Sequence, residues 1–161
     1  MNEDTRKTVQ LLAEHELALK ELYETYATLL PSRKDLWLNL AQDEQRHAHW
    51  LDSLLAAAGP ADAPGSCLWP RRAAIETSLK YVRGQIVRAR QAKVTLVIAL
   101  SVAKDLESAL LEKEFFKVAD STRAETRAVL NRLTAATEIH WRTVSEALDQ
   151  AKRTPADAQR A

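Results

Sequence analysis

Apolar residues recur at helical spacing along nearly the whole chain, and this pattern constrains the fold more than any other feature. Steps of three and four residues, the repeat of a buried helix face, run through four long stretches. Residues that break helices are rare, because the 161 residues include only 3 glycines and 5 prolines. A β-rich chain needs a turn residue about every 8–12 residues, which this chain does not supply. We therefore predict an all-α fold.

The few glycines and prolines also indicate how the helices are connected. Five of them fall within residues 59–70, which forms the one long connector. We expect a single domain with helices over 4–30, 33–58, 73–90, 94–119 and 122–151 and a disordered tail over 152–161. An unbroken helix over 75–118 would overhang its neighbours, so we predict a break near Arg90–Thr95, with Gly84 as the second choice. Two helical hairpins, joined by a long crossover with a short helix, form the ferritin-like arrangement of a four-helix bundle.

The charge of the chain is high but balanced, with 23 Lys and Arg residues against 22 Asp and Glu residues and a net charge of +1. This balance implies no general attraction to nucleic acid or to an anionic membrane. The longest apolar run, Val94–Ala103, is about half the length that crosses a bilayer. The N-terminal residues do not have the pattern of a secretory signal, so we expect a cytoplasmic protein. A single cysteine excludes an internal disulfide framework and a Cys-x-x-Cys metal site.

The segment Arg71–Lys93 departs from this balance, since it carries seven basic residues and one acidic residue, Glu76. We interpret it as the solvated face of the crossover helix. The alternative is a docking surface for an acidic partner or for nucleic acid. Nucleic acid is disfavoured because Tyr81 is the only aromatic residue in the segment.

Polar residues interrupt each of the four long apolar stripes near its middle. In chain order, these residues are Glu16, Glu44 with His47, Glu107, and His140. A buried carboxylate without a partner is costly, so such groups are paired or bind metal. A di-iron or di-manganese site in a bundle takes one Glu from each of two helices and Glu-x-x-His from each of the other two. The sequence therefore supplies five of these six ligands.

The sixth ligand position is occupied by Thr137, three residues before His140. Its neutral hydroxyl is a poor substitute for a carboxylate. Glu138 is one residue away, about 100° around the helix, so we expect its side chain to point away from the site. We predict weaker or asymmetric metal binding, with one strongly held ion or an exogenous ligand in the gap.

Three segments resemble the rubrerythrin-like branch of the ferritin superfamily. They are ELALKELYETYA (16–27), WLNLAQDEQRHAHWLDSL (37–54) and ALSVAKDLESALLEKEFF (99–116). The resemblance covers all four long helices and is carried by Glu16 with Tyr23, by Glu44 with His47, and by Glu107. The chain departs from the family pattern at Thr137 and in having no rubredoxin-like Cys-x-x-Cys pair.

The resemblance implies non-haem iron chemistry, in which hydrogen peroxide is reduced or dioxygen reacts. The implied cofactor is iron, as a pair or a single ion, with manganese or zinc as substitutes. Tyr23 would hydrogen-bond near the metal, although a purely structural role in the core is the alternative. Electrons would come from another protein, and a homodimer is the expected assembly. The competing hypothesis is a metal-free bundle with a decayed site, which acts as an interaction or scaffold protein.

Overall fold

The computed structural model describes residues 3–57, 71–112 and 124–153, and these ranges contain helices and no strand. The helices are α1 (Glu3–Leu29), α2 (Lys34–Ala57), α3 (Arg72–Gln91), α4 (Leu96–Glu112) and α5 (Ala124–Arg153), with a short 3-10 turn, Pro31–Arg33, after α1. The prediction of an all-α fold is confirmed. Helix ends that can be compared lie within a few residues of those expected from the sequence.

Some of the expected elements lie outside the described residues. They are the end of the fourth helix over 113–119, the start of the last helix at 122–123, residue 58 at the end of the second helix, the whole connector over 59–70, and the tail over 154–161. Lys152 and Arg153, which we expected in the tail, instead form the last turn of α5. Their positive charges lie where the negative end of the helix dipole favours them.

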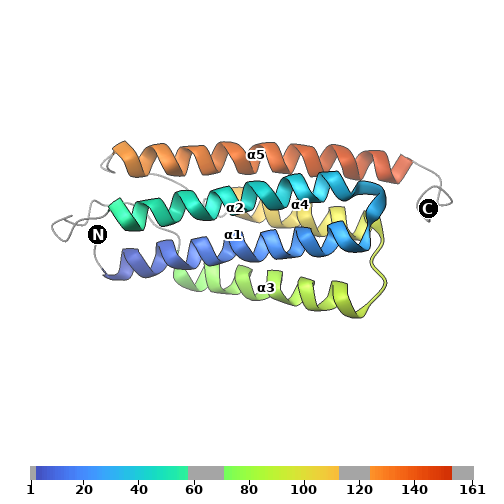
Figure 1. Cartoon of the computed structure of the whole chain (residues 1–161), viewed down its shortest axis with the longest axis horizontal. Helices are drawn as coiled ribbons and strands as arrows, with labels where there is room; N and C mark the ends of the chain where they lie inside the picture. The colour runs from blue at the N-terminus through green and yellow to red at the C-terminus, as the bar shows by residue number, and fades with distance from the viewer. Residues whose placement is uncertain (1–2, 58–70, 113–123, 154–161) are drawn as a thin grey trace.

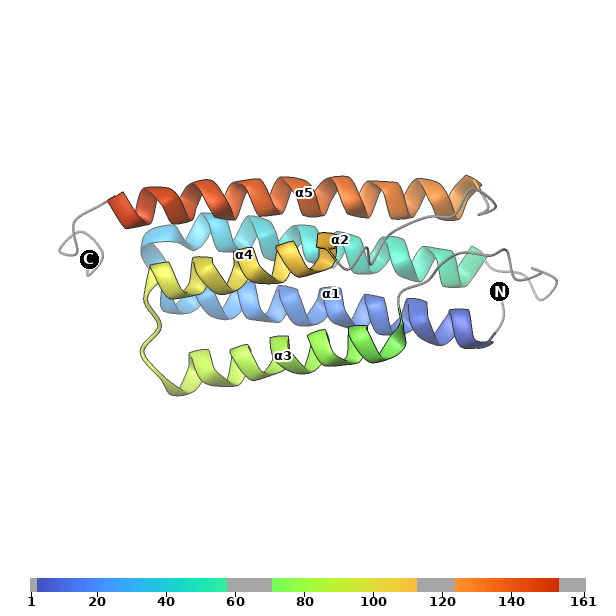
Figure 2. The same cartoon turned by 180° about the vertical axis from the view of Figure 1, so that it is seen from behind.

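The helices lie side by side along one common direction (Figure 1). An antiparallel hairpin is formed by α1 and α2, and a second antiparallel pair is formed by α4 and α5. Seen from behind, α3 lies along α1 at the edge of the molecule opposite α5 and runs in the same direction as α1 (Figure 2). It follows the first pair and precedes the second pair in the chain, so it carries the chain back along the length of the molecule. The two pairs also meet where α2 contacts α5.

Helix α3 buries the apolar face that its sequence predicts. The buried residues of this face include Ile75, Leu79, Val82, Ile86 and Ala89. Three ion pairs border the same interface, namely Asp4–Arg72 at 3.3 Å, Glu14–Arg83 at 3.6 Å and Glu21–Arg90 at 2.8 Å. Part of the basic segment 71–93 therefore serves to pair α3 with the acidic edge of α1.

The chain breaks between α3 and α4, as the sequence predicts. Ala92 has an extended backbone, with φ −128° and ψ 156°, so it ends α3. The Thr95 hydroxyl then accepts a hydrogen bond of 3.3 Å from the backbone N–H of Ile98, in the first turn of α4. The alternative break at Gly84 is wrong, because Gly84 lies within α3.

One polar contact crosses the apolar interface between α1 and α3. The His15 side chain is fully buried, and its Nε2 lies 2.9 Å from Oγ of Ser78. Burial lowers the pKa of His15, so the imidazole is neutral near pH 7. His15 is therefore an inter-helix residue between α1 and α3. In the part of the chain that the structure describes, no helix is both long enough and apolar enough to cross a membrane.

Candidate metal centre

The polar residues that interrupt the four stripes come together in one buried cluster between the helices. Glu16 comes from α1, Glu44 and His47 from α2, Glu107 from α4 and His140 from α5. None of these residues is more than 3% exposed. The cluster lies inside the bundle because each residue has at least one buried apolar side chain three or four positions away on its own helix: Leu12 and Leu19 for Glu16, Ala41 and Ala48 for Glu44, Leu51 for His47, Ala103 and Leu110 for Glu107, and Val144 for His140.

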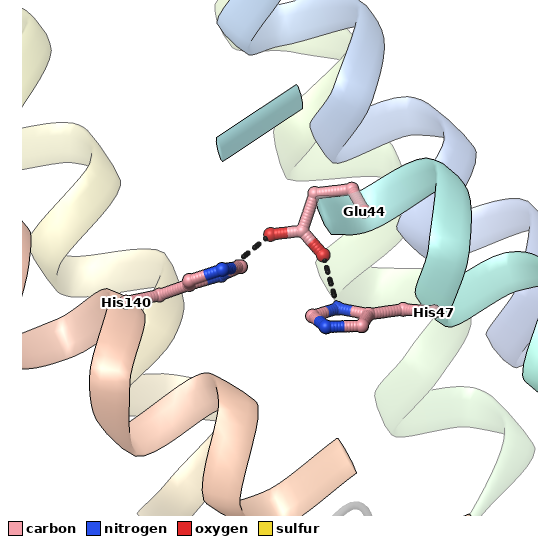
Figure 3. A group of neighbouring side chains, drawn as sticks. All are labelled: Glu44, His47 and His140. Atoms are coloured by element: carbon pink, nitrogen blue, oxygen red, sulfur yellow. Dashed lines mark hydrogen bonds and ion pairs between the residues drawn. The ribbon is translucent and has the colours of Figure 1, made fainter. Parts of the chain in front are cut away.

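The Glu44 carboxylate lies between the two imidazoles, with one oxygen directed toward each (Figure 3). Its Oε2 is 2.7 Å from Nδ1 of His47, one helical turn later on α2. Its Oε1 is 3.0 Å from Nδ1 of His140 on α5. The remaining two carboxylates lie at the edges, with Glu16 Oε2 3.3 Å from His47 Nδ1 and Glu107 Oε1 3.6 Å from His140 Nδ1.

This arrangement could hold a metal ion. One ligand atom from each of Glu44, His47 and His140 lies within 4.8 Å of the others. Metal–ligand bonds of about 2.0–2.2 Å to nitrogen and oxygen would bring such atoms to one ion with small side-chain movements. Imidazole and carboxylate are ligands that suit iron, manganese and zinc.

Several nitrogen and oxygen atoms of the cluster have no hydrogen-bond partner among the residues that the structure describes. They are Glu16 Oε1, Glu44 Oε1, Glu107 Oε2 and His140 Nδ1. The Glu44–His140 contact of 3.0 Å is an ion pair without the alignment of a hydrogen bond. Buried polar atoms normally have partners, so four such atoms in one cluster are unusual. A cation among these oxygens and nitrogens would provide the missing interactions.

Without a metal ion, protons provide the positive charge of the cluster. Burial opposes protonation of His47, but its contacts with Glu16 and Glu44 raise its pKa to about 9. For His140, burial has the same opposing effect, and contacts with Glu107 and Glu44 raise the pKa to about 11. Burial, together with the charge of Glu44, raises the pKa of Glu16 to about 7. Burial would also raise the pKa of Glu44, but its contacts with the two imidazoles outweigh burial and lower it.

Tyr23 of α1 connects the cluster to the aromatic core. Its hydroxyl donates a hydrogen bond of 2.6 Å to Oε1 of Glu107. Burial and the charge of Glu107 raise the pKa of Tyr23 well above its ordinary value, so the phenol keeps its proton. The ring packs against Trp37, with 5.9 Å between ring centroids. Tyr23 therefore holds a proton beside one carboxylate of the cluster.

Helix α5 contributes an imidazole but no carboxylate. Thr137 is buried, and its hydroxyl donates a hydrogen bond of 3.0 Å to the backbone carbonyl of Leu133 in the same helix. Glu138 is exposed and pairs with Arg142 at 3.6 Å, on another side of α5. The expectation that Glu138 points away from the site is confirmed.

Sequence reasoning missed Asp43, which directly precedes Glu44. Its Oδ2 lies 3.2 Å from Nε2 of His140, and the same side chain pairs with Arg46. Carboxylates that contact the second nitrogen of a ligand histidine fix its orientation and make it a stronger ligand. The one signal in the sequence was an acidic residue next to Glu-x-x-His. Nothing in the spacing relates Asp43 to a histidine 97 residues later on another helix.

The surroundings of His47 limit its contact with solvent. The half-buried Trp50 ring lies 5.2 Å from the His47 ring, between centroids. Arg132 of α5 stacks over the same indole at 4.9 Å, so this residue pair covers one side of the cluster. His49, two residues after His47, is exposed and takes no part in the cluster.

Comparison with models of protein families, with curated proteins and with solved structures finds no match to this chain.

Proposed function

We propose that this chain is a rubrerythrin-like, ferritin-like protein that binds non-haem iron and reacts with peroxide or dioxygen. The observation that supports the proposal is the buried cluster of Glu44, His47 and His140, whose ligand atoms converge within 4.8 Å. The topology is consistent with this assignment, since two antiparallel helix pairs are joined by a crossover through α3. The polar residues of the cluster on α1, α2, α4 and α5 also supply five of the six ligands that a two-ion bundle site requires.

The residues of the cluster have distinct roles in this proposal. Glu44, His47 and His140 would hold the iron, and Glu16 and Glu107 would border it. Bound iron would pass electrons from an external donor to the O–O bond of the substrate, and the reduction of hydrogen peroxide to two water molecules takes two electrons and two protons. The surrounding apolar residues exclude bulk water, and Tyr23 keeps a proton 2.6 Å from Glu107 Oε1.

The proposal also includes an external electron donor. The chain has one cysteine and therefore no Cys-x-x-Cys iron site of its own. A small electron-transfer protein would reduce the iron between turnovers. We further propose a homodimer, which the mass measured by light scattering would test.

The direct test is the iron content of the protein. The chain purified from iron-supplemented cells, or loaded anaerobically with Fe²⁺, should retain iron after gel filtration. The Glu44→Gln variant should not, because it removes the carboxylate that faces both imidazoles. Reduced, iron-loaded protein should then consume hydrogen peroxide faster than an equal amount of this variant. Failure of the unsubstituted protein to retain iron would contradict the proposal.

The second candidate function is a metal-free interaction or scaffold protein. The observation that favours it is that protonated His47 and His140 already pair with the carboxylates around them. If the cluster is only a remnant, replacing all five of its polar residues together by apolar residues of similar volume, with Tyr23→Phe, should leave the chain as stable as before or more stable, because apolar replacement of a whole group of buried charges is often neutral or stabilising. If the cluster binds iron, the same variant should lose iron uptake.

A further inference from the structure

We propose that the chain holds one metal ion, coordinated by Glu44, His47 and His140, and not the pair of ions that a complete set of four carboxylates would hold. This inference rests on the proposed metal-binding function and specifies its stoichiometry and ligands. Two imidazoles and one carboxylate are the ligand set of mononuclear non-haem iron centres, which keep positions open for exogenous ligands.

The distances in the cluster suit donors around a single ion. Ligand atoms at right angles on an ion with bonds of about 2.1 Å lie about 3 Å apart. Glu44 Oε2 is 2.7 Å from His47 Nδ1, and Glu44 Oε1 is 3.0 Å from His140 Nδ1. Among residues 3–57, 71–112 and 124–153, these three form the one group of His, Cys, Asp and Glu residues whose ligand atoms converge in this way.

A second ion would lack a carboxylate from α5. Thr137 occupies the position one turn before His140, where its hydroxyl is hydrogen-bonded to the Leu133 carbonyl. The nearest acidic side chain of this helix, Glu138, is on another side and pairs with Arg142. The second position would therefore depend on Glu107 and on ligands shared with the first ion.

In a one-ion site, the carboxylates of Glu16 and Glu107 would lie beside the ion without binding it and would accept hydrogen bonds. Oε1 of Glu107 already accepts the hydrogen bond from Tyr23, and Oε2 of Glu16 lies 3.3 Å from His47. Their other oxygens, Glu16 Oε1 and Glu107 Oε2, are buried and have no hydrogen-bond partner within the described ranges 3–57, 71–112 and 124–153. We expect these two oxygens to accept hydrogen bonds from water or substrate on the open positions of the ion.

The stoichiometry of metal binding tests the inference without any measurement of activity. The full chain is titrated anaerobically with Co²⁺, followed by visible absorption, and then with Fe²⁺, followed by elemental analysis after gel filtration. Both titrations should saturate at one ion per chain. The Glu44→Gln variant should bind none, whereas the Glu107→Gln variant should still bind one.

A variant that restores the absent carboxylate provides the complementary test. Thr137→Glu should raise the stoichiometry from one ion to two. Two matched controls should remain at one ion: Thr137→Gln, which adds similar bulk without charge, and Ala135→Glu, which adds a carboxylate at an exposed position on another side of α5. Circular dichroism checks that each variant is folded. If Thr137→Glu does not fold, the stoichiometry of the unsubstituted chain and of Glu107→Gln still decides the question.

The possible failures are distinguishable. Two ions per unsubstituted chain, with one lost in Glu107→Gln, would overturn the one-ion inference and leave the proposed function intact. One ion that survives in Glu44→Gln would overturn the ligand set. No binding of Co²⁺ or Fe²⁺ by the unsubstituted chain would overturn the proposed function and this inference together.

Discussion

The Tyr23 hydroxyl donates a hydrogen bond of 2.6 Å to the Glu107 carboxylate, between two residues 84 positions apart in the sequence. Both side chains are at most 1% exposed. The bond links α1 of the first helix pair to α4 of the second, at the level of the candidate metal centre. The hydrogen bond therefore connects the two helix pairs and also gives one carboxylate of the cluster a donor.

Removing this hydroxyl should destabilise the metal-free protein. In the Tyr23→Phe variant, a buried carboxylate oxygen loses its hydrogen-bond donor, which costs about 1–3 kcal/mol in the free energy of unfolding. Urea denaturation in the presence of a chelator measures the difference. Tyr26→Phe is the matched control, since Tyr26 is buried on the same helix and its tilted ring packs against Trp37, with 5.0 Å between ring centroids. Equal losses in the two variants would argue against a specific role for the hydrogen bond to Glu107.

The metal-free protein should become less stable as the pH rises. His47 and His140 have folded-state pKa values of about 9 and about 11, above the ordinary value for histidine. Their stabilisation is complete below the ordinary pKa and is lost as the pH rises through the folded-state values. Glu16, with a pKa raised to about 7, acts in the same direction at lower pH.

Thermal unfolding of the metal-free protein, measured in the presence of a chelator between about pH 6 and pH 9, tests this dependence. The midpoint temperature should fall across the range. His140→Gln should flatten the profile, whereas His49→Gln, which changes an exposed histidine on α2, should leave its slope unchanged. A midpoint that rises with pH would show that the imidazoles are not held protonated by the carboxylates.

Metal binding should have the opposite pH dependence. An ion coordinated by His47 and His140 must displace their protons, so the apparent affinity increases as the pH rises. The increase in midpoint temperature caused by Co²⁺ should therefore be larger at high pH than at low pH. Calorimetric titrations in two buffers with different ionisation enthalpies measure the protons released. Binding without proton release would place the ion away from these imidazoles.

The contact between Asp43 and His140 should strengthen metal binding from outside the ligand set. In the Asp43→Asn variant, His140 loses the charged partner that lies 3.2 Å from its Nε2. The affinity for the metal ion should fall by about 10–100-fold, the usual effect of changing a residue that contacts a metal ligand but not the metal itself. Asp52→Asn, which removes an exposed carboxylate from the same helix, should leave the affinity unchanged. Equal effects in the two variants would indicate only a change in net charge.

The sequence predicted best the features that follow directly from helical periodicity and helix length. Seam spacing placed Glu16, Glu44 and Glu107 inside the bundle, because one turn of a helix fixes which side chains share a face. The break after α3 followed from a mismatch in helix lengths. Contacts between helices could not be obtained in this way, since the pairing of Asp43 with His140 depends on how two helices rotate against each other.

The packing of α3 also depends on contacts that spacing does not reveal. The basic residues of segment 71–93 are exposed, as predicted for a solvated face, and three of them, Arg72, Arg83 and Arg90, also pair with acidic residues of α1. These pairs are exposed, so each contributes at most about 1 kcal/mol to stability. The apolar face beneath them accounts for more of the attachment of α3 than the charges do.

The buried contact between His15 and Ser78 should contribute more to the attachment of α3 than any of the exposed ion pairs. In the Ser78→Ala variant, His15 loses a hydrogen bond of 2.9 Å in a site that water does not reach, which costs about 1–3 kcal/mol. Thr77→Ala is the matched control, because Thr77 is exposed and its hydroxyl bonds only to the backbone of its own helix at Ala73. Both changes favour helix formation slightly, so any excess loss in Ser78→Ala reports the contact with α1. Hydrogen exchange of the α3 amides should accelerate in Ser78→Ala and not in Thr77→Ala, and equal exchange in the two variants would contradict this role.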